Sequence, residues 1–198
     1  MQPILLASSS PYRRELLSKL ELPFEWASPN VDETPLINEI ADELVIRLAR
    51  DKAQALAEDY PRHLIIGSDQ AAVLGSESLG KPHNYERAFA QLKAASGKHV
   101  IFKTGLCLLN TLTNQTQICV GEFSVFFRKL SDEQIHNYLI YETPYDCAGS
   151  FKCEGLGIAL FNKLIGDDPN TLIGLPLIRL VEMLKHEGVD PLILAKKK

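Results

Sequence analysis

Residues 63–70, with the sequence HLIIGSDQ, decide the fold that we expect for this chain. The apolar run LIIG at residues 64–67 predicts a strand that is buried on both faces, as in a sheet covered by helices. Because Asp is disfavoured inside strands, Asp69 directly after this run indicates a strand that delivers a carboxylate. The alternative is an Asp at the end of a loop that bonds its own backbone.

Strands and helices alternate in both halves of the chain, with a hairpin between them. A buried strand at residues 4–7 precedes a helix at residues 11–20, for which Ser10 is a favourable N-cap. The other expected strands lie near residues 24–27, 70–74, 100–110, 116–128 and 158–164, and the other helices near 40–58, 85–95, 131–141 and 170–185. Residues 111–115 form the hairpin, so the pattern predicts the α/β class with a mixed sheet, in a single domain spanning residues 1–198.

Composition excludes several classes of protein. With 45% apolar and 23% charged residues the chain is close to the globular average, which argues against disorder and coiled coil. No apolar run approaches the roughly 20 residues that a membrane-spanning helix needs. A net charge of −4, from 21 basic and 25 acidic residues, argues against general nucleic-acid binding. The start, MQPI, has no basic and apolar leader, and the four cysteines form no C-x-x-C pair, so we expect reduced thiols in the cytoplasm.

Three basic side chains stand where an anion would explain them. Arg13 and Arg14 lie in the first turn of a predicted helix, where the helix dipole opposes cations but backbone N–H groups favour a phosphate. The alternative is a surface pair with Glu15. Lys52 follows the apolar stripe of the helix at 40–58, marked by Leu44, Leu48, Ala55 and Leu56, so its ammonium group either finds an anion or extends to solvent.

Acidic residues provide a candidate metal site. Glu33 follows one strand and Asp69 lies in another, and carboxylates of this kind suit Mg²⁺ or Mn²⁺, which complete their ligand shell with phosphates and water. Local backbone bonding is the ordinary alternative. Glu154, in a glycine-flanked loop, is either a solvated side chain or an acceptor for a guanine edge. Residues 75–81 match G-x-x-x-x-G-K, but Pro82 stands where a phosphate-binding loop needs Ser or Thr, so we reject that motif and keep Lys81 as a phosphate contact.

Together, these motifs resemble the Maf family of nucleotide pyrophosphatases along essentially the whole chain. They are ASSSPxRRxLL at residues 7–17, VDETP at 31–35, KA at 52–53, GSDQ at 67–70, GKP at 80–82, AGS at 148–150, GxG at 155–157 and GLPL at 174–177. The resemblance implies an elongated mixed α/β fold with two lobes around a cleft, similar to the inosine triphosphate pyrophosphatases. It also implies metal-dependent hydrolysis of a nucleoside triphosphate to a monophosphate and diphosphate, and a homodimer, since family members are often dimeric.

Three positions direct the resemblance to one branch of the family. Where the branch acting on dTTP and UTP has Arg, Thr and Gln, this chain has Tyr12, Gln70 and Glu154, and it looks like the branch acting on 7-methyl-GTP. That branch typically has Trp in place of Tyr12. An aromatic face attracts the positively charged methylated base, by about 0.5–2 kcal/mol, and Glu154 can accept the guanine N1–H and amino protons.

The resemblance implies a role for each candidate residue. Asp69 is the expected general base for water, and Glu33 and Asp69 are the expected ligands of Mg²⁺ or Mn²⁺. The expected contacts to the nucleotide come from Ser8, Tyr12, Arg13, Arg14, Lys52, Gln70, Lys81 and Glu154. The alternatives are the same chemistry on dTTP, UTP or another modified nucleotide, a nucleotide-binding regulator of cell division without turnover, and a generic phosphatase that releases orthophosphate.

Overall fold

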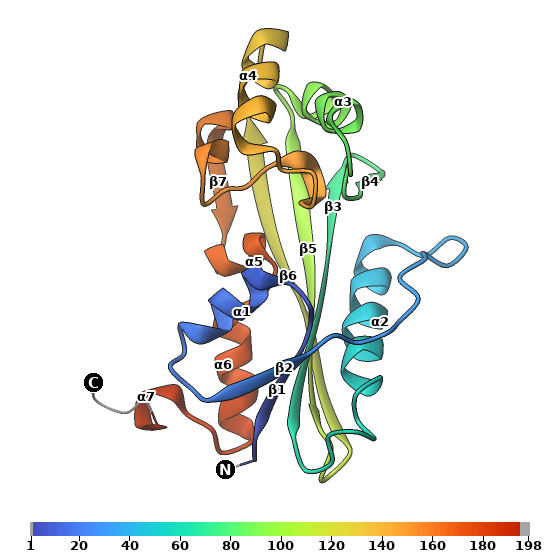
Figure 1. Cartoon of the computed structure of the whole chain (residues 1–198), viewed down its shortest axis with the longest axis vertical. Helices are drawn as coiled ribbons and strands as arrows, with labels where there is room; N and C mark the ends of the chain where they lie inside the picture. Colours follow the sequence, from blue (N-terminus) through green and yellow to red (C-terminus); the bar gives the residue numbers. More distant parts are fainter. Residues whose placement is uncertain (1, 195–198) are drawn as a thin grey trace. The chain divides into compact units, whose positions relative to one another are not determined.

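The computed structural model describes residues 2–194 and has a mixed α/β architecture (Figure 1). Its strands are β1 (Ile4–Ala7), β2 (Phe24–Ala27), β3 (Leu64–Leu74), β4 (Glu77–Leu79), β5 (His99–Asn110), β6 (Gln115–Phe127) and β7 (Phe161–Gly166). Its α-helices are α1 (Pro11–Ser18), α2 (Ala41–Gln54), α3 (Tyr85–Ala95), α4 (Asp132–Glu142), α5 (Pro169–Ile173), α6 (Leu177–His186) and α7 (Pro191–Leu194). Two 3₁₀ turns, η1 (Ala148–Ser150) and η2 (Leu156–Leu160), precede β7. The expected fold class is confirmed.

Within the described residues, the strands form one sheet in the order β2-β1-β3-β5-β6-β7, with β4 paired to β3. β1 is parallel to β2 and β3, whereas the β3–β4 and β6–β7 pairs are antiparallel. The β1–β3 register runs from Ile4 opposite Leu64 to Ala7 opposite Gly67. Because β1 ends there and β3 continues, Asp69 lies just beyond the carboxyl end of β1. Ligands of α/β proteins commonly bind at that end of parallel strands.

The chain divides into two compact units. Unit 1 contains the residues up to Asp69, Thr104–Gly121 and the residues from Asp168 onward, and unit 2 contains Gln70–Lys103 and Glu122–Asp167. The long strands β3, β5 and β6 contribute residues to both units. That the whole chain acts as one domain stays a prediction.

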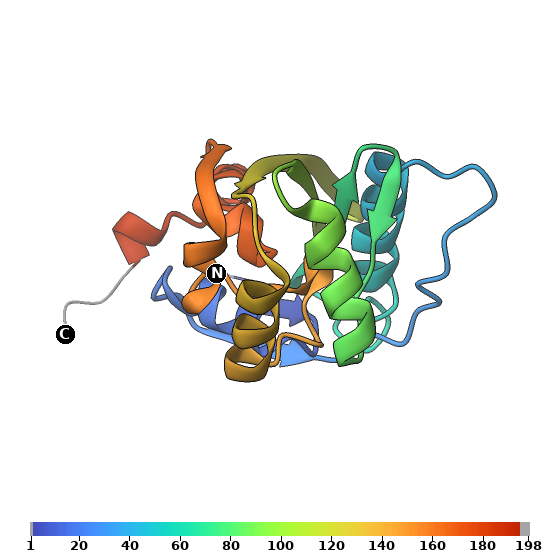
Figure 2. The ribbon, with the colours of Figure 1, turned by 90° about the horizontal axis from the view of Figure 1, so that it is seen from above.

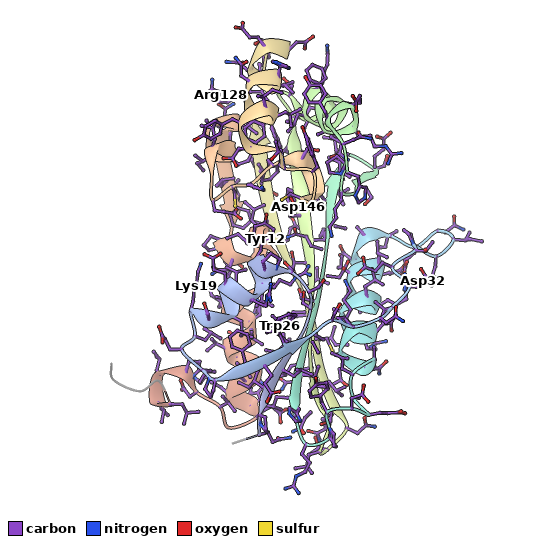
Figure 3. The ribbon with its side chains drawn as sticks, in the orientation of Figure 1. Tyr12, Lys19, Trp26, Asp32, Arg128 and Asp146 are labelled. Atoms are coloured by element: carbon purple, nitrogen blue, oxygen red, sulfur yellow. The ribbon has the colours of Figure 1, made fainter. Side chains whose placement is uncertain are left out.

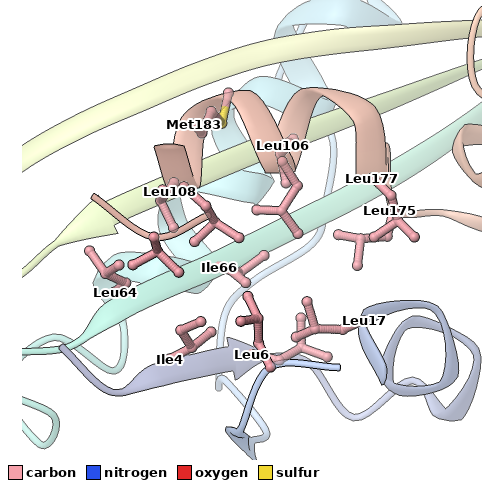
Figure 4. Packing of buried hydrophobic residues seen from close by; sticks show 14 of the residues in the cluster. Ile4, Leu6, Leu17, Leu64, Ile66, Leu106, Leu108, Leu175, Leu177 and Met183 are labelled. Atoms are coloured by element: carbon pink, nitrogen blue, oxygen red, sulfur yellow. The ribbon is translucent and has the colours of Figure 1, made fainter. Parts of the chain in front are cut away.

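Helices bury both faces of the sheet in unit 1. Ile4, Leu6 and Ile66 belong to a cluster that includes side chains of α1 and α6 (Figure 4). The alternate residues Leu5 and Ile65 pack with Ala49 and Ala53 of α2 on the opposite face. This double burial explains the continuous apolar runs of β1 and β3, which the sequence predicts to be buried strands.

The backbone of α2 packs directly on the sheet at two glycines. A Cβ at Gly67 would collide with the carbonyl oxygen of Ala49, and one at Gly105 with that of Val45. Val45 and Ala49 are one helical turn apart, so successive turns of α2 rest on β3 and β5. Any larger side chain at either glycine would push the helix away from the sheet.

Aromatic packing forms the core of unit 2. Phe151 makes edge-to-face contacts with Phe102, Phe127 and Phe161, with ring centroids 4.8–5.7 Å apart. Helices α3 and α4 lie side by side and belong to the same unit (Figure 2). The sequence between Pro144 and Gly157, which has few regular elements, is thereby anchored through Phe151.

Several expected boundaries differ from the structure. The helix expected to run to residue 58 ends at Gln54, and the strand expected at 158–164 is replaced by η2 followed by β7. The turn expected at residues 75–82 contains the short strand β4, whose hairpin with β3 is unlike a phosphate-binding loop. The expected last helix is split into α5 and α6 because Gly174 has φ of 116° and Pro176 cannot donate a backbone hydrogen bond.

The local expectations for two helix caps are confirmed. Ser10 caps α1 by accepting a hydrogen bond from the backbone N–H of Arg13, and Ser131 and Gln134 form the capping box of α4. All four cysteines are free. No helix among residues 2–194 has the length and apolar character needed to cross a membrane.

Replacing Gly67 with Ala tests the close approach of α2. We expect a loss of at least about 2 kcal/mol in the free energy of unfolding, because the added methyl group meets backbone that cannot move without separating helix and sheet. Urea denaturation measures this loss. Gly80→Ala is the matched control, since no atom lies within 4 Å of its added Cβ. Equal midpoints for the two variants would contradict this account.

Candidate active site at the carboxyl end of β1

The segment after β1 forms a turn that leads into α1. Ser8 is buried, and its Oγ accepts a hydrogen bond from the backbone N–H of Ser10 at 3.1 Å. Ser10 in turn caps the helix, and Tyr12 lies in its first turn (Figure 3). The N–H groups of this turn therefore lie at the carboxyl end of β1, within the same unit as Asp69.

Lys52 joins the two candidate metal ligands. Its Nζ lies 2.6 Å from Oε1 of Glu33 and 2.6 Å from Oδ1 of Asp69. The side chains of Lys52 and Asp69 are only 7% and 13% exposed, whereas that of Glu33 is 59% exposed. The expectation that Lys52 faces inward is confirmed, and the anions it meets are these two carboxylates.

Helix packing explains why Lys52 reaches Asp69. The buried residues of α2 include Val45, Ala49 and Lys52. This stripe differs from the expected one, because Leu44 is only half-buried and Ala55 is exposed. Ala49 rests on Gly67, and Lys52 lies one turn further along α2. Asp69 is two residues beyond Gly67 and therefore on the same face of β3.

An arginine on α2 fastens the loop that carries Glu33. Arg47 donates from Nε and Nη2 to the two carboxylate oxygens of Glu39, at 2.6 and 2.8 Å, and from Nη2 to the carbonyl oxygen of Thr34 at 3.1 Å. The hydrogen bonds from the Arg47 side chain lower the pKa of Glu39 to about 2. The loop is thus tied to α2 one residue after Glu33.

The neighbouring carboxylate of Asp32 has a local role. Its Oδ1 accepts the backbone N–H of Thr34 at 2.9 Å, and hydrogen bonds from the side chain and then the backbone of Thr34 lower the pKa of Asp32. Asp32 lies on the loop before α2 (Figure 3). Of the acidic pair at residues 32–33, therefore, Glu33 reaches Lys52 and Asp32 shapes the turn.

Arg13 is the second cation near the carboxylates. Its Nε donates to the carbonyl oxygen of Gly174 at 2.8 Å. Burial lowers its pKa, and the charges of Asp69 and Glu33 act in the opposite direction. Arg13, Lys52, Glu33 and Asp69 come from four separate segments of unit 1 and form one electrostatic cluster, which we call the charge cluster.

Two other predicted phosphate contacts have surroundings of a different kind. The guanidinium carbon of Arg14 lies 4.1 Å from the ring centroid of Trp26, a half-exposed residue of β2. Arg13 and Arg14 are adjacent on α1, and adjacent side chains on a helix point in different directions. Lys81 is exposed and follows β4 in unit 2. Their contacts with substrate stay predictions.

The three expected base-selecting residues are divided between the units. Tyr12 is half-buried on α1 in unit 1, and Gln70 is half-buried in the part of β3 that belongs to unit 2. Glu154 is exposed in unit 2, and its Oε2 accepts a hydrogen bond from the thiol of Cys153 at 3.1 Å. Their joint role toward a base stays a prediction.

Oxygen donors at the charge cluster fit a magnesium-type ion. The carboxylates of Glu33 and Asp69 converge on a single point, the Nζ of Lys52, and each has a second oxygen. No group of three or more His, Cys, Asp or Glu residues able to hold a metal occurs in residues 2–194. A pair of carboxylates is what Mg²⁺ commonly uses when substrate phosphates supply further ligands.

The sequence assigns no individual role to three contributors to this site. The carbonyl oxygen of Gly174 contacts both Arg13 and Ser68. Arg47 holds the loop that carries Glu33 through the carbonyl oxygen of Thr34. A signal for Gly174 was present, because a glycine followed two residues later by proline indicates a helix end. Nothing in the sequence identifies Arg47, whose partner Glu39 lies eight residues away in a loop.

Known structures first place this chain in a fold class. It is similar to the Staphylococcus aureus Ham1 protein, with a TM-score of 0.51 and 13% sequence identity, over 94% of this chain and all of that chain. At this identity the likeness concerns the fold alone, and it agrees with the mixed α/β sheet.

Sequence relatives then define the family. Residues 3–187 match the model of the Maf-like proteins, and the chain belongs to this family. It is 61% identical to the 7-methyl-GTP pyrophosphatase of Pseudomonas putida, over 96% of this chain and 98% of that protein. It is 57% identical to the protein of that name from Pseudomonas aeruginosa, over 96% and 99% of the two chains. For that of Nitrosococcus oceani the identity is 58%, over 93% of each chain.

Removing the central ammonium group tests the charge cluster. Lys52→Met keeps the length of the side chain but leaves the weakly exposed Asp69 without its cation, so we expect a loss of about 3 kcal/mol in the free energy of unfolding. Lys93→Met is the matched control, because Lys93 and its partner Asp132 are 58% and 65% exposed and such pairs contribute about 1 kcal/mol or less. Urea denaturation measures the free energy of unfolding of both variants. Equal losses in the two variants would contradict the expectation that the buried Lys52–Asp69 pair contributes more than an exposed pair.

Proposed function

We propose that this chain hydrolyses 7-methyl-GTP to 7-methyl-GMP and diphosphate, by attack of water on the α-phosphate. The observation that carries the proposal is the charge cluster, in which Lys52 bridges Glu33 and Asp69 beside Arg13. The names of relatives that are 57–61% identical over nearly their whole length support the choice of substrate. Such a cluster contains the acidic and the basic groups that hydrolysis of a phosphoanhydride requires.

In this proposal Asp69 accepts the proton of the attacking water. The carboxylate of Asp69 forms an ion pair with Lys52, and the backbone of Asp69 belongs to strand β3. The position of the carboxylate is therefore defined before substrate binds. General base catalysis of this kind contributes about 10²–10⁴ in rate. A fixed carboxylate that is 13% exposed can still meet a water molecule.

The phosphate chain would meet Arg13 and Lys52. Arg13 matches phosphate oxygens with its planar guanidinium group, whereas Lys52 acts as a point charge. We add Ser8, Arg14 and Lys81 to the proposed phosphate-binding residues because they occur in the family motifs. Stabilisation of the charge on the departing diphosphate is the expected effect of these groups.

A divalent cation, Mg²⁺ or Mn²⁺, is proposed as the cofactor, held by Glu33 and Asp69. Within the charge cluster two cations already balance two carboxylates, so the charge of a triphosphate calls for a further positive group. When bound, such an ion would supply electrostatic stabilisation of the phosphate oxygens. Glu33 is well suited to exchange between Lys52 and an ion, because its side chain is 59% exposed.

We propose that the nucleotide base is selected by Tyr12, Gln70 and Glu154. Glu154 would accept the guanine N1–H and amino protons, a pair that UTP and dTTP lack. Tyr12 would offer its ring to the positively charged methylated base. The exposed position of Glu154 leaves its carboxylate accessible to a ligand.

The setting of the enzyme is also part of the proposal. Four free cysteines are in keeping with a reducing compartment, and we place the protein in the cytoplasm. We propose a homodimer on the strength of the family resemblance, and analytical ultracentrifugation tests it. The partner molecule at the site is a nucleotide rather than a nucleic acid, in line with the net charge of −4.

Product analysis tests the proposed reaction. A panel of 7-methyl-GTP, GTP, UTP and dTTP is incubated with the chain and Mg²⁺ or Mn²⁺, and diphosphate and orthophosphate are measured separately. We expect diphosphate, with 7-methyl-GTP as the preferred substrate. Release of orthophosphate indicates a phosphatase, and binding without turnover indicates a regulator; either result contradicts the proposal.

Substitution of the proposed base is the direct test of mechanism. Asp69→Asn is expected to lower kcat by roughly 10²–10⁴, because the amide cannot accept the proton. The control Asp132→Asn removes a carboxylate from an exposed ion pair and is expected to keep wild-type turnover. Circular dichroism verifies that both variants are folded. A wild-type kcat for Asp69→Asn would remove this residue from the mechanism.

Base selectivity is tested at Glu154. We expect Glu154→Gln to reduce the ratio of kcat/KM for 7-methyl-GTP to that for UTP by roughly 10- to 100-fold, the equivalent of one hydrogen-bonding pair to a charged group. Glu133→Gln, at an exposed residue of α4, is the control and should leave the ratio unchanged. An unchanged ratio in Glu154→Gln would end the assignment.

A further inference from the structure

One backbone carbonyl joins the arginine of the charge cluster to the strand of the proposed base. The carbonyl oxygen of Gly174 accepts a hydrogen bond from Nε of Arg13 at 2.8 Å. It also lies 3.0 Å from Oγ of Ser68, whose one hydroxyl proton is shared with the carbonyl oxygen of Gly105 at 2.8 Å. Ser68 is fully buried and immediately precedes Asp69 on β3. This carbonyl oxygen therefore contacts both Arg13 and the residue that precedes Asp69.

Gly174 is held in an unusual conformation. It ends α5 with φ of 116° and ψ of 18°, and its N–H bonds back to the carbonyl oxygen of Asn170. Side chains other than glycine rarely adopt such a φ. A Cβ built there would lie 3.4 Å from Nε of Arg13 and 3.5 Å from Nη2. The backbone conformation therefore favours glycine, and an added Cβ would make ordinary van der Waals contact with Arg13.

The turn that contains Gly174 is anchored at several points. Asp168, which is buried, accepts the backbone N–H of Asn170 through Oδ1 and that of Ile178 through Oδ2, both at 2.8 Å. Thr104 of β5 donates from its buried hydroxyl to the carbonyl oxygen of Thr171 at 2.9 Å. These bonds fix the direction of the Gly174 carbonyl with respect to the sheet of unit 1.

The contact with Gly174 uses only one side of the guanidinium group. Nε of Arg13 is occupied, whereas neither terminal nitrogen has a hydrogen-bond partner among residues 2–194. Within those residues every fully enclosed side-chain nitrogen or oxygen has a partner, so the two terminal nitrogens are not completely enclosed, although burial of the group lowers the pKa of Arg13. An arginine fixed through Nε presents its other donors as a fork, the geometry that binds two phosphate oxygens at once.

We propose that Gly174 is a positioning residue, whose carbonyl group orients Arg13 toward the phosphate chain of the substrate. The inference rests on the proposed function in that Arg13 is taken to bind phosphate. Preorganisation of this kind removes the need to order a long side chain when the ligand binds. It also explains why the helix expected at residues 170–185 is broken at Gly174, since a continuous helix would use this carbonyl internally.

A double-mutant cycle tests the inference, with inorganic triphosphate as the probe. Gly174→Ala is expected to weaken triphosphate binding, measured by isothermal titration calorimetry, and to lower kcat/KM, each roughly 10- to 100-fold. Arg13→Lys keeps the charge but lacks the fork. In the Arg13→Lys background, Gly174→Ala should change either quantity by less than about 3-fold, because the group it positions is already gone.

Gly188→Ala is the matched control for backbone strain. Gly188 also has a positive φ, 75°, and no atom lies within 4 Å of its added Cβ. Its triphosphate affinity and kcat/KM should remain within about 2-fold of wild type. Equal effects of Gly174→Ala and Gly188→Ala, or equal effects of Gly174→Ala in the wild-type and Arg13→Lys backgrounds, would overturn the inference.

A measurement on the wild-type chain covers the case in which Gly174→Ala does not fold. The Nε–H proton of Arg13, assigned by its loss in Arg13→Lys, should exchange slowly with solvent in NMR spectra. It should remain protected when triphosphate binds, because the ligand uses the terminal nitrogens. Fast exchange, or loss of protection on binding, would overturn the inference.

The outcomes separate this inference from the proposed function. A chain that binds triphosphate with the expected coupling but releases no diphosphate from nucleotides supports the inference and contradicts the function. If the chain shows the expected turnover but the effects of Gly174→Ala and Arg13→Lys are additive, the inference is contradicted and the proposed function is not. Absence of triphosphate binding by the wild-type chain overturns the inference directly.

Discussion

The close packing of α2 on Gly67 and Gly105 is the constraint on which the rest of unit 1 depends. It allows two turns of helical backbone to rest on the sheet without intervening side chains. Lys52, one turn beyond Ala49, then reaches the carboxylate of Asp69 on the same face of β3. Larger residues at the two glycines would move α2 away from the sheet, and Lys52 would lose its contact with Asp69.

Charge balance in the cluster has consequences for binding. Arg13 and Lys52 face Asp69 and Glu33, and each side chain comes from a different segment of the chain. The ammonium group and Arg13 offset the cost of placing the Asp69 carboxylate where water is scarce. The same groups are those that a polyphosphate would use, so stability and recognition rest on shared residues.

Local physics allowed much of this arrangement to be predicted from sequence. The serine caps, the two-face burial of β1 and β3, and the inward direction of Lys52 all follow from spacing within one element. Arg14 shows where such reasoning ends, because its position in the first turn of α1 indicates a phosphate or Glu15, whereas in the structure its guanidinium group lies over the ring of Trp26. The break at Gly174 was missed because helical apolar spacing continues on both sides of it.

By itself the sequence determined the fold class, the family, and the residue types that carry the charges, since these depend on composition, periodicity and motifs. Only the tertiary structure decided which charges meet. Lys52 and Asp69 are separated by 17 residues and Arg13 and Gly174 by 161, and their contacts depend on how a helix seats on a sheet and where a turn aims one carbonyl group. Hydrogen bonds and ion pairs act over a few ångströms, a scale that spacing along the chain does not specify.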